Sequence, residues 1–306
     1  GKAGLLIAGT CFIAPAALLT LVVARAYVGY GALPRVQGAL YGIKPVIIAV
    51  VSLALWRLGA TALKTPALFA VAIASIAADL FGMNQVAIIF AAGIVMLAAR
   101  ARWTRAASAL VPMLAVAPST TAAALSNVAA PFSLLALFLF FAKVGAVLFG
   151  SGYVLLAFLQ SDLVERYGWL TQTQLLDAIA VGQLTPGPVF TTATFVGYLL
   201  GATPGALVAT AGIFAPAFVF VAASAPLVPR LRESALAAAF LDGVNAASLA
   251  LMAVVTIDLG RAAIIDVPTA ALALVSAALL IRYRINSAWL VVAGAVGGLA
   301  ASAIAR

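Results

Sequence analysis

Histidine is absent from this chain of 306 residues, and cysteine occurs once, at Cys11. Without histidine the chain has no side chain that ordinarily gains and loses a proton near neutral pH. One cysteine can form no disulfide within the chain, and with no histidine beside it haem attachment and Cys/His zinc sites are excluded as well. We therefore expect no metal and no cofactor.

Charged side chains are also scarce, at 8% of the residues, whereas 66% are hydrophobic. Soluble domains carry about 25% charged residues. Apolar runs near the roughly 20 residues that cross a bilayer recur along the whole chain, and alternating ten-residue segments typical of a membrane barrel are not seen. The composition predicts an all-α polytopic membrane protein embedded in a lipid bilayer.

The net charge of +9 does not indicate a nucleic-acid partner. Lysine and arginine fall singly or in pairs at the ends of the apolar runs, where positive charge orients membrane helices. The first apolar run, 5–23, contains Pro15 and recurs later in the chain. It is therefore a membrane span rather than a cleaved signal peptide.

The chain repeats itself at an offset of 201 residues (205 − 4). The matching pairs share one register without a gap: Gly4/Gly205, Leu6/Leu207, Ala8/Ala209, Ala14/Ala215, Pro15/Pro216, Leu40/Leu241, Gly42/Gly243, Leu58/Leu259, Gly59/Gly260, Ser75/Ser276 and Gly93/Gly294. A duplicated module explains them. Four spans are predicted in each copy, at 4–24, 38–58, 66–82 and 84–99, and at 205–224, 238–260, 267–281 and 287–303.

Positive charge lies at opposite helix ends in the two copies. In the first copy one side of the membrane holds most of the lysines and arginines. In the second copy the equivalent side holds fewer lysines and arginines than the opposite side. If positive charge marks the cytoplasm, the two copies insert in opposite directions. Inverted repeats are typical of secondary transporters, which bind their substrates near the midplane.

Three regions follow from the repeat: an incomplete first copy at 1–100, a polar cytoplasmic linker at 101–130, and a complete second copy at 131–306. The first copy has no counterpart of 131–201, and the sequence begins without methionine. We expect the chain to be the C-terminal part of a longer protein. A naturally shortened transporter is the alternative.

Lys143 lies inside the apolar run 134–149. A lysine at the centre of a membrane helix costs about 2.5–3.5 kcal/mol on insertion scales, so it usually faces a cavity, a counter-ion or an anionic substrate. The alternative is that its long side chain reaches the membrane surface. Lys44 is a second candidate nearer a helix end, and Asn245 is its partner at the repeat offset.

Gly150-Ser151-Gly152 interrupts the membrane-like sequence a short distance after Lys143. Small residues there would let helices pack closely, or would unwind the helix and expose backbone N–H groups to an anion. The following segment, 160–169, is polar, with Asp162, Glu165 and Arg166. We expect it to form a loop at the membrane surface.

A second break follows at Gln183-Leu184-Thr185-Pro186-Gly187-Pro188. Thr171 and Gln174 have capping-box spacing, which predicts a helix from there to about residue 184. The prolines end it and begin another helix, with a polar stripe of Thr191, Thr194 and Tyr198. The pair forms a re-entrant hairpin or a broken span, with zero or two crossings. The start of the second helix would direct its N-terminal N–H groups at an anion. The alternative is a kink that binds no ligand.

These motifs together resemble the chromate transporter family along nearly the whole chain. The pieces that carry the resemblance are IAP (13–15), YGIKP (41–45), FFAKVG (140–145), FGSG (149–152), ERYGWL (165–170), QLTPGP (183–188), TFVGY (194–198), PGA (204–206) and FAP (214–216). Two features depart from the family: a glycine run appears as Gly-Ser-Gly, and the N-terminal copies of the two break motifs are absent.

The resemblance implies an efflux transporter of the bacterial plasma membrane, made of two homologous halves, that expels chromate. Chromate is a tetrahedral dianion, for which lysine, hydroxyls and helix N-termini are suitable partners. The substrate-binding hypothesis names, beside Lys143, Lys44 and Asn245, the residues of the two breaks: Gly150, Ser151, Gly152, Gln183, Thr185, Pro186, Gly187, Pro188 and Thr191. Asp177 and Asp242 are candidates for coupling transport to the proton gradient.

Other functions stay open. A transporter of sulfate or another anion fits the same residues, because sulfate matches chromate in shape and charge. An intramembrane enzyme is disfavoured, because we find no histidine, no paired membrane carboxylates and no serine–base arrangement. A structural membrane protein would not need Lys143. Transport direction and oligomeric state are open, with a homodimer as one option.

Overall fold

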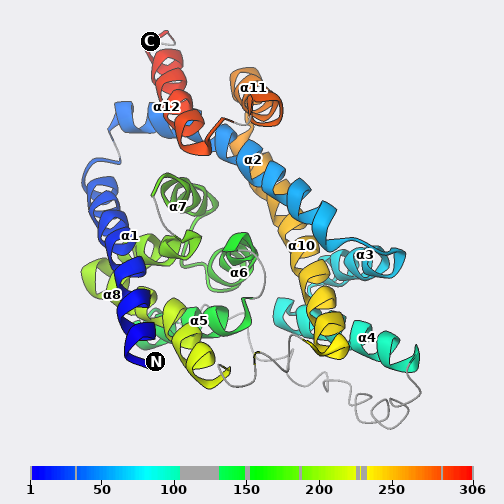
Figure 1. Cartoon of the computed structure of the whole chain (residues 1–306). Helices are drawn as coiled ribbons and strands as arrows, with labels where there is room; N and C mark the ends of the chain where they lie inside the picture. Colours follow the sequence, from blue (N-terminus) through cyan, green and yellow to red (C-terminus); the bar gives the residue numbers. More distant parts are fainter. Residues whose placement is uncertain are drawn as a thin grey trace. The chain divides into compact units, whose positions relative to one another are not determined.

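A computed structural model describes residues 2–31, 33–103, 131–148, 152–185, 188–224, 228, 233–283 and 285–304 (Figure 1). Within these ranges the regular secondary structure is helical throughout. Four helices are long and apolar enough to cross a membrane. The predicted all-α polytopic class is confirmed.

Each of the eight predicted spans coincides with a helix or with part of one. In chain order these are α1 (Lys2–Tyr30), α2 (Pro34–Ala62), α3 (Pro66–Leu80), α4 (Gln85–Trp103), α8 (Thr192–Ser224), α10 (Ala235–Ala263), α11 (Val267–Tyr283) and α12 (Ser287–Ile304). Proline is the first residue of α2 and of α3. At this position a backbone N–H makes no hydrogen bond within the helix, so proline's lack of one costs nothing. With 15 and 17 residues, α3 and α11 fall short of the roughly 20 that span a bilayer. The predicted linker begins inside α4, and its remainder, 104–130, lies outside the described residues.

Six shorter elements form the central stretch: α5 (Leu134–Val147), η3 (Gly152–Val154), α6 (Leu155–Phe158), η4 (Leu159–Arg166), α7 (Gln172–Leu184) and η5 (Val189–Thr191). The predicted surface loop at 160–169 was wrong over 160–166. That part continues the helix in a wider π-helical turn, with Gln160 and Asp162 buried. Polar side chains survive burial there because they find charged or hydrogen-bonding partners inside the protein.

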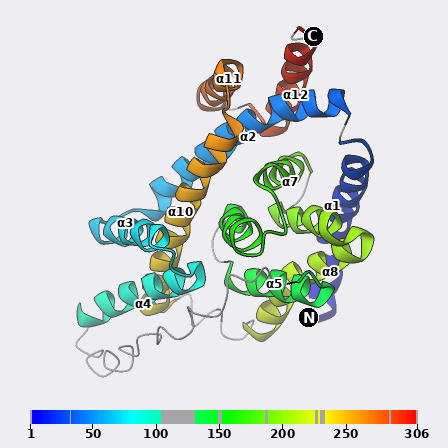
Figure 2. The ribbon, with the colours of Figure 1, turned by 180° about the vertical axis from the view of Figure 1, so that it is seen from behind.

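The chain divides into two compact units. The first comprises Gly1–Arg57, Phe132–Ala223 and Met252–Arg306, and the second comprises Leu58–Pro131 and Ser224–Leu251. All contacts given below lie within one unit or the other. In the first unit, α1, α5, α6, α7 and α8 gather together in both views (Figures 1 and 2).

Helix packing recurs at the offset found in the sequence. In the first unit a Cβ on Gly260 would lie 3.7 Å from Ile48, and in the second unit a Cβ on Gly59 would lie 3.5 Å from Leu249. An offset of 201 residues turns Ile48 into Leu249 and Gly59 into Gly260. This agreement supports the duplicated module. The inversion of the two copies stays a prediction.

The closest helix crossing of the first unit joins α2 to α12. A Cβ on Gly42 would lie 2.0 Å from the carbonyl oxygen of Gly294 and 2.6 Å from the backbone nitrogen of Gly298. Only glycine permits this approach, as at the small-residue crossings of other membrane helices. The crossing fixes α2 two residues before Lys44, and so fixes where that lysine lies.

Candidate functional site

The first break folds the chain back on itself. Helix α5 ends at Val147, Leu148 is extended, and η3 begins at Gly152. Three contacts then join the two arms: Lys143 with Asp162, the rings of Phe140 and Tyr167 with centroids 6.5 Å apart, and those of Phe132 and Trp169 at 5.4 Å. As the residue number falls along the first arm, from 143 to 132, the number of the contacted residue rises along the second, from 162 to 169, so the two arms run antiparallel.

The second break is also a hairpin. Helix α7 ends at Leu184, Thr185 and Pro188 are extended, and η5 begins at Val189. A Cβ on Gly182 would lie 2.1 Å from the hydroxyl of Thr192. Further from the turn, Asp177 and Phe195 both contact Tyr27 of α1. The two arms therefore run side by side.

The second arm reverses again after a short distance. Backbone angles leave the helical region at Gly201 and Ala202 inside α8. The hydroxyls of Thr194, before this kink, and Thr210, after it, lie 2.7 Å apart. Twelve residues, 189–200, precede this reversal, and α7 has 13. At 1.5 Å per residue each arm is about 20 Å long, shorter than the roughly 30 Å hydrocarbon core. These lengths favour the re-entrant alternative for 171–201.

The two restarted helices meet at their first turns. A Cβ on Gly152 would lie 3.2 Å from Cβ of Val189 and 3.4 Å from the ring of Phe190. Each helix leaves unpaired N–H groups and the positive end of its dipole at this point. Two breaks separated along the sequence thus place two helix starts against each other.

Lys143 lies four residues before the end of α5 (147 − 143) and is paired. Its ammonium contacts the carboxylate of Asp162, which is buried, whereas the lysine side chain is 36% exposed. Arg166 approaches the other oxygen of Asp162 at 3.8 Å, and Lys143 lies 5.4 Å from the ring centroid of Phe140. Of the options that the sequence left for Lys143, the counter-ion is therefore the one that the structure provides.

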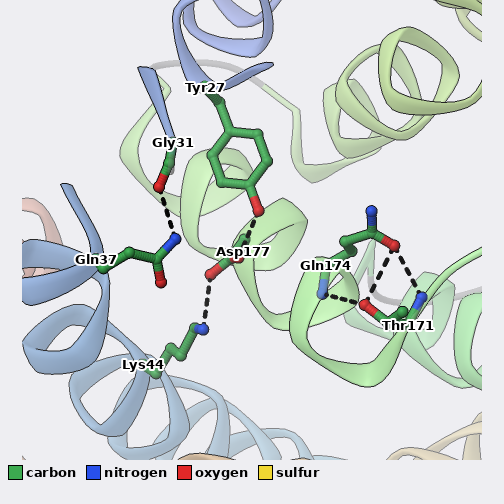
Figure 3. Close-up of polar contacts among 7 residues, drawn as sticks. All are labelled: Tyr27, Gly31, Gln37, Lys44, Thr171, Gln174 and Asp177. Atoms are coloured by element: carbon green, nitrogen blue, oxygen red, sulfur yellow. Dashed lines mark hydrogen bonds and ion pairs between the residues drawn. The ribbon is translucent and has the colours of Figure 1, made fainter. Parts of the chain in front are cut away.

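Lys44 is paired as well. Its Nζ lies 3.1 Å from Oδ1 of Asp177, with side chains 15% and 2% exposed. The hydroxyl of Tyr27 donates to Oδ2 of the same carboxylate at 2.7 Å. Figure 3 shows the lysine of α2 and the tyrosine of α1 approaching Asp177 of α7 from different sides. The carboxylate thereby links three helices.

The start of α7 is fixed by its predicted capping box. Thr171 accepts from the Gln174 backbone nitrogen at 3.2 Å, and the Gln174 side chain accepts from the Thr171 backbone nitrogen at 2.9 Å (Figure 3). These bonds satisfy two of the free N–H groups at the helix start. The predicted cap and helix end are confirmed. The box anchors the helix that carries Asp177.

Hydroxyl groups at the second break bond locally. Thr185 donates to the Gly182 carbonyl at 3.3 Å, and Thr191 donates to the Pro188 carbonyl at 3.0 Å. Buried hydroxyls of Thr20 on α1 and Thr192 at the start of α8 lack a hydrogen-bond partner among the described residues. Element η5 packs against α1 and α7. Unsatisfied buried hydroxyls of this kind call for an explanation, such as a ligand or a water.

The remaining predicted site residues are distributed as follows. Gly150, Ser151, Pro186 and Gly187 lie outside the described residues. Gln183 is partly exposed in the last turn of α7. Asn245 is half-buried and Asp242 exposed on α10, and both belong to the second unit.

Sequence reasoning missed Tyr27, Asp162 and Thr192. Asp162 was assigned to a surface loop because its neighbours are polar, although its buried position on the helix faces Lys143. Tyr27 and Thr192 carry no signal in the sequence, since tyrosine and threonine are common in membrane helices. Only the packing of α1 and α8 on α7 brings them to the site.

Comparison with known proteins decides the family. The model of the chromate transporter family, described as "Chromate transporter", matches residues 1–97 and 135–299. The chain belongs to the chromate transporter family. The match leaves out the whole of the predicted linker, 101–130, and includes the turns of both hairpins.

Curated relatives agree with this assignment. The chain is 34% identical to the chromate transport protein of Cupriavidus metallidurans, over 95% of the chain and 73% of that protein. It is 33% identical to the chromate transport protein of Pseudomonas aeruginosa, over 88% and 67%, and 28% identical to a probable chromate transport protein of Synechococcus elongatus, over 90% and 71%. No solved structure matches it significantly.

Family and helices together define the setting of this family member. Its four long apolar helices make it a multi-pass membrane protein, and its family places it in the bacterial plasma membrane. The relatives are named as transporters, which indicates transport rather than catalysis.

Proposed function

We propose that this protein transports chromate across the bacterial plasma membrane. The observation that carries the proposal is the contact between the two restarted helices at Gly152 and Val189. Short helices that meet at a break inside the membrane are how many secondary transporters bind ions, with helix N-termini directed at anionic groups. Family membership supplies the substrate class: three relatives are named for chromate transport.

The substrate site in this proposal lies at the meeting point of the hairpins. Backbone N–H groups at both breaks and the ammonium of Lys143 bind the oxygens of the dianion, and Thr192 offers a free hydroxyl. The Lys143 side chain is about one-third exposed, and its partner Asp162 also pairs with Arg166, so the group keeps a net positive charge near the first break. Lys44 is the supporting group within the first unit, and the role expected for Asn245 stays a prediction.

Efflux is the proposed direction. In a cell with a negative interior, each negative charge that leaves gains about 2.3 kcal/mol per 100 mV, so the potential drives a dianion outward. Coupling to protons is assigned to Asp177, which is buried against Lys44, with Asp242 as the second candidate. The homodimer stays a prediction.

Sulfate is the second candidate substrate. It has the tetrahedral shape and double negative charge of chromate, and backbone N–H groups with a lysine do not distinguish the two by hydrogen bonding. The relatives' names favour chromate. Competition between the two anions for uptake into vesicles measures the preference directly.

Flux into proteoliposomes tests the proposal. The purified chain, reconstituted with an imposed membrane potential, is expected to move radiolabelled chromate many-fold faster than empty liposomes. Replacing Lys143 by Ala should abolish that flux, whereas Lys64→Ala, at an exposed lysine two residues after the end of α2, should leave it unchanged. Full transport by Lys143→Ala would contradict the role given to this lysine.

A further inference from the structure

In the first unit, Tyr27, Lys44 and Asp177 form a cluster that the proposed function does not fully explain. It joins one residue from each of three helices, and Asp177 is 1% exposed. We propose that the Asp177 carboxylate takes the place of the oxyanion in the empty transporter. It pairs with the ammonium of Lys44 until the substrate binds that ammonium and displaces Asp177. This inference rests on the proposed function, because it concerns how the same transporter admits its anion.

The geometry permits such an exchange because the two carboxylate oxygens have different partners. Lys44 lies 3.1 Å from Oδ1, whereas Tyr27 donates to Oδ2 at 2.7 Å. Lys44 can therefore leave Asp177 while Tyr27 still holds the carboxylate. Asp177 is the one ion-pair partner of Lys44 in the described part of the chain, so two of the three ammonium protons have no recorded acceptor there.

The charge balance also favours exchange over simple addition. The ion pair of Lys44 with Asp177 has no net charge to attract a dianion. The anion must therefore bind elsewhere or compete with Asp177 for the Lys44 ammonium. A buried carboxylate deprived of its lysine is costly, unless another donor or a proton compensates it. Tyr27 is that donor. The hydroxyl thus keeps the displaced state of Asp177 accessible, which makes Tyr27 a positioning residue.

A proton is the other compensating group. No second carboxylate faces Asp177 from the helices packed most closely on α7: α1 contributes Tyr27, and η5 and the described side chains of α12 contain no titratable residue. On η4, Asp162 is paired with Lys143 and Arg166, and Glu165 accepts from Gln160. A proton on Asp177 would remove the charge that competes for Lys44, so a proton and an oxyanion favour each other's binding at this cluster.

Equilibrium binding of radiolabelled chromate to the purified protein tests the exchange, at about pH 8, where carboxylates are ionised. Asp177→Asn keeps the shape and removes the competing charge, and it should bind chromate about tenfold more tightly than the wild type. Tyr27→Phe leaves Lys44 as the only described partner of Asp177, and this variant should bind chromate about threefold more weakly than the wild type. Asp258→Asn is the matched control: this partly exposed carboxylate pairs with Arg261 on the same helix, and its loss should change nothing.

The opposite signs separate this inference from a structural role, which would weaken binding or leave it unchanged in both variants. Should Asp177→Asn not fold, Tyr27→Phe still tests the exchange, because unchanged or tighter binding there overturns it. If the wild type binds chromate and Asp177→Asn binds it equally or less well, only the exchange is wrong. If the wild type neither binds nor transports chromate or sulfate, the proposed function is wrong and the inference falls with it.

Discussion

The crossing of α2 and α12 predicts a defined penalty for adding one methyl group at Gly42. The new Cβ would lie 2.0 Å from the Gly294 carbonyl oxygen, and such contacts are essentially never closer than 3.0 Å, so the helices must separate by at least about 1 Å. Overpacking of this kind costs about 1–3 kcal/mol. The better helix propensity of alanine returns at most about 1 kcal/mol. Gly42→Ala should therefore be destabilised.

Gly59→Ala on the same helix is the matched control, because its Cβ would lie at an ordinary 3.5 Å from Leu249. We expect its thermal unfolding midpoint in detergent to match or exceed that of the wild type, and Gly42→Ala to unfold at a lower temperature. Chromate flux should also fall in Gly42→Ala, since Lys44 would shift from Asp177, now 3.1 Å away. Equal midpoints and equal flux in the two variants would refute the reasoning.

Three further predictions concern stability, each read from thermal unfolding of the purified protein. Ala202 has a φ of 49°, which favours glycine, so Ala202→Gly should stabilise by about 1 kcal/mol, whereas Ala206→Gly in the helix beyond should destabilise. Thr171→Ala removes the α7 cap and should cost about 1 kcal/mol, with exposed Thr173→Ala nearly neutral. Hydrogen bonds from Tyr41 and Thr269 lower the pKa of Asp266. That contribution is complete above the unfolded pKa and is lost as the pH falls below about 4, so Asp266→Asn should flatten only the acidic limb of the stability profile.

The helices were predictable because their signals are local. Apolar runs, prolines at first turns and the Thr171–Gln174 box each act within a few residues, and the observed helices agree with them. The two breaks were likewise visible, since glycine and proline disrupt a helix wherever it lies. What the sequence left open was whether the chain continues or turns back after each break.

The pairing of charges was less predictable because it depends on that folding back. Asp162 is 19 residues from Lys143, and Asp177 is 133 residues (177 − 44) from Lys44, yet each pair is in contact. A polar stretch such as 160–166 reads as a surface loop until its partner is known. The first hairpin supplies Lys143 as the partner of Asp162, whereas Lys44 reaches Asp177 from α2, a helix distant in the sequence.

The role of Lys143 in binding the oxyanion is tested most directly by chromate flux through a variant in which both charges of the Lys143–Asp162 ion pair are removed. Lys143→Gln with Asp162→Asn removes both charges, so neither partner is left buried and unpaired. If Lys143 binds the oxyanion, this double variant should fold with near wild-type thermal stability and lose at least about tenfold in flux, equivalent to about 1.4 kcal/mol. A folded double variant that transports chromate at the wild-type rate would contradict the central claim, because the ion pair would then only hold the hairpin together.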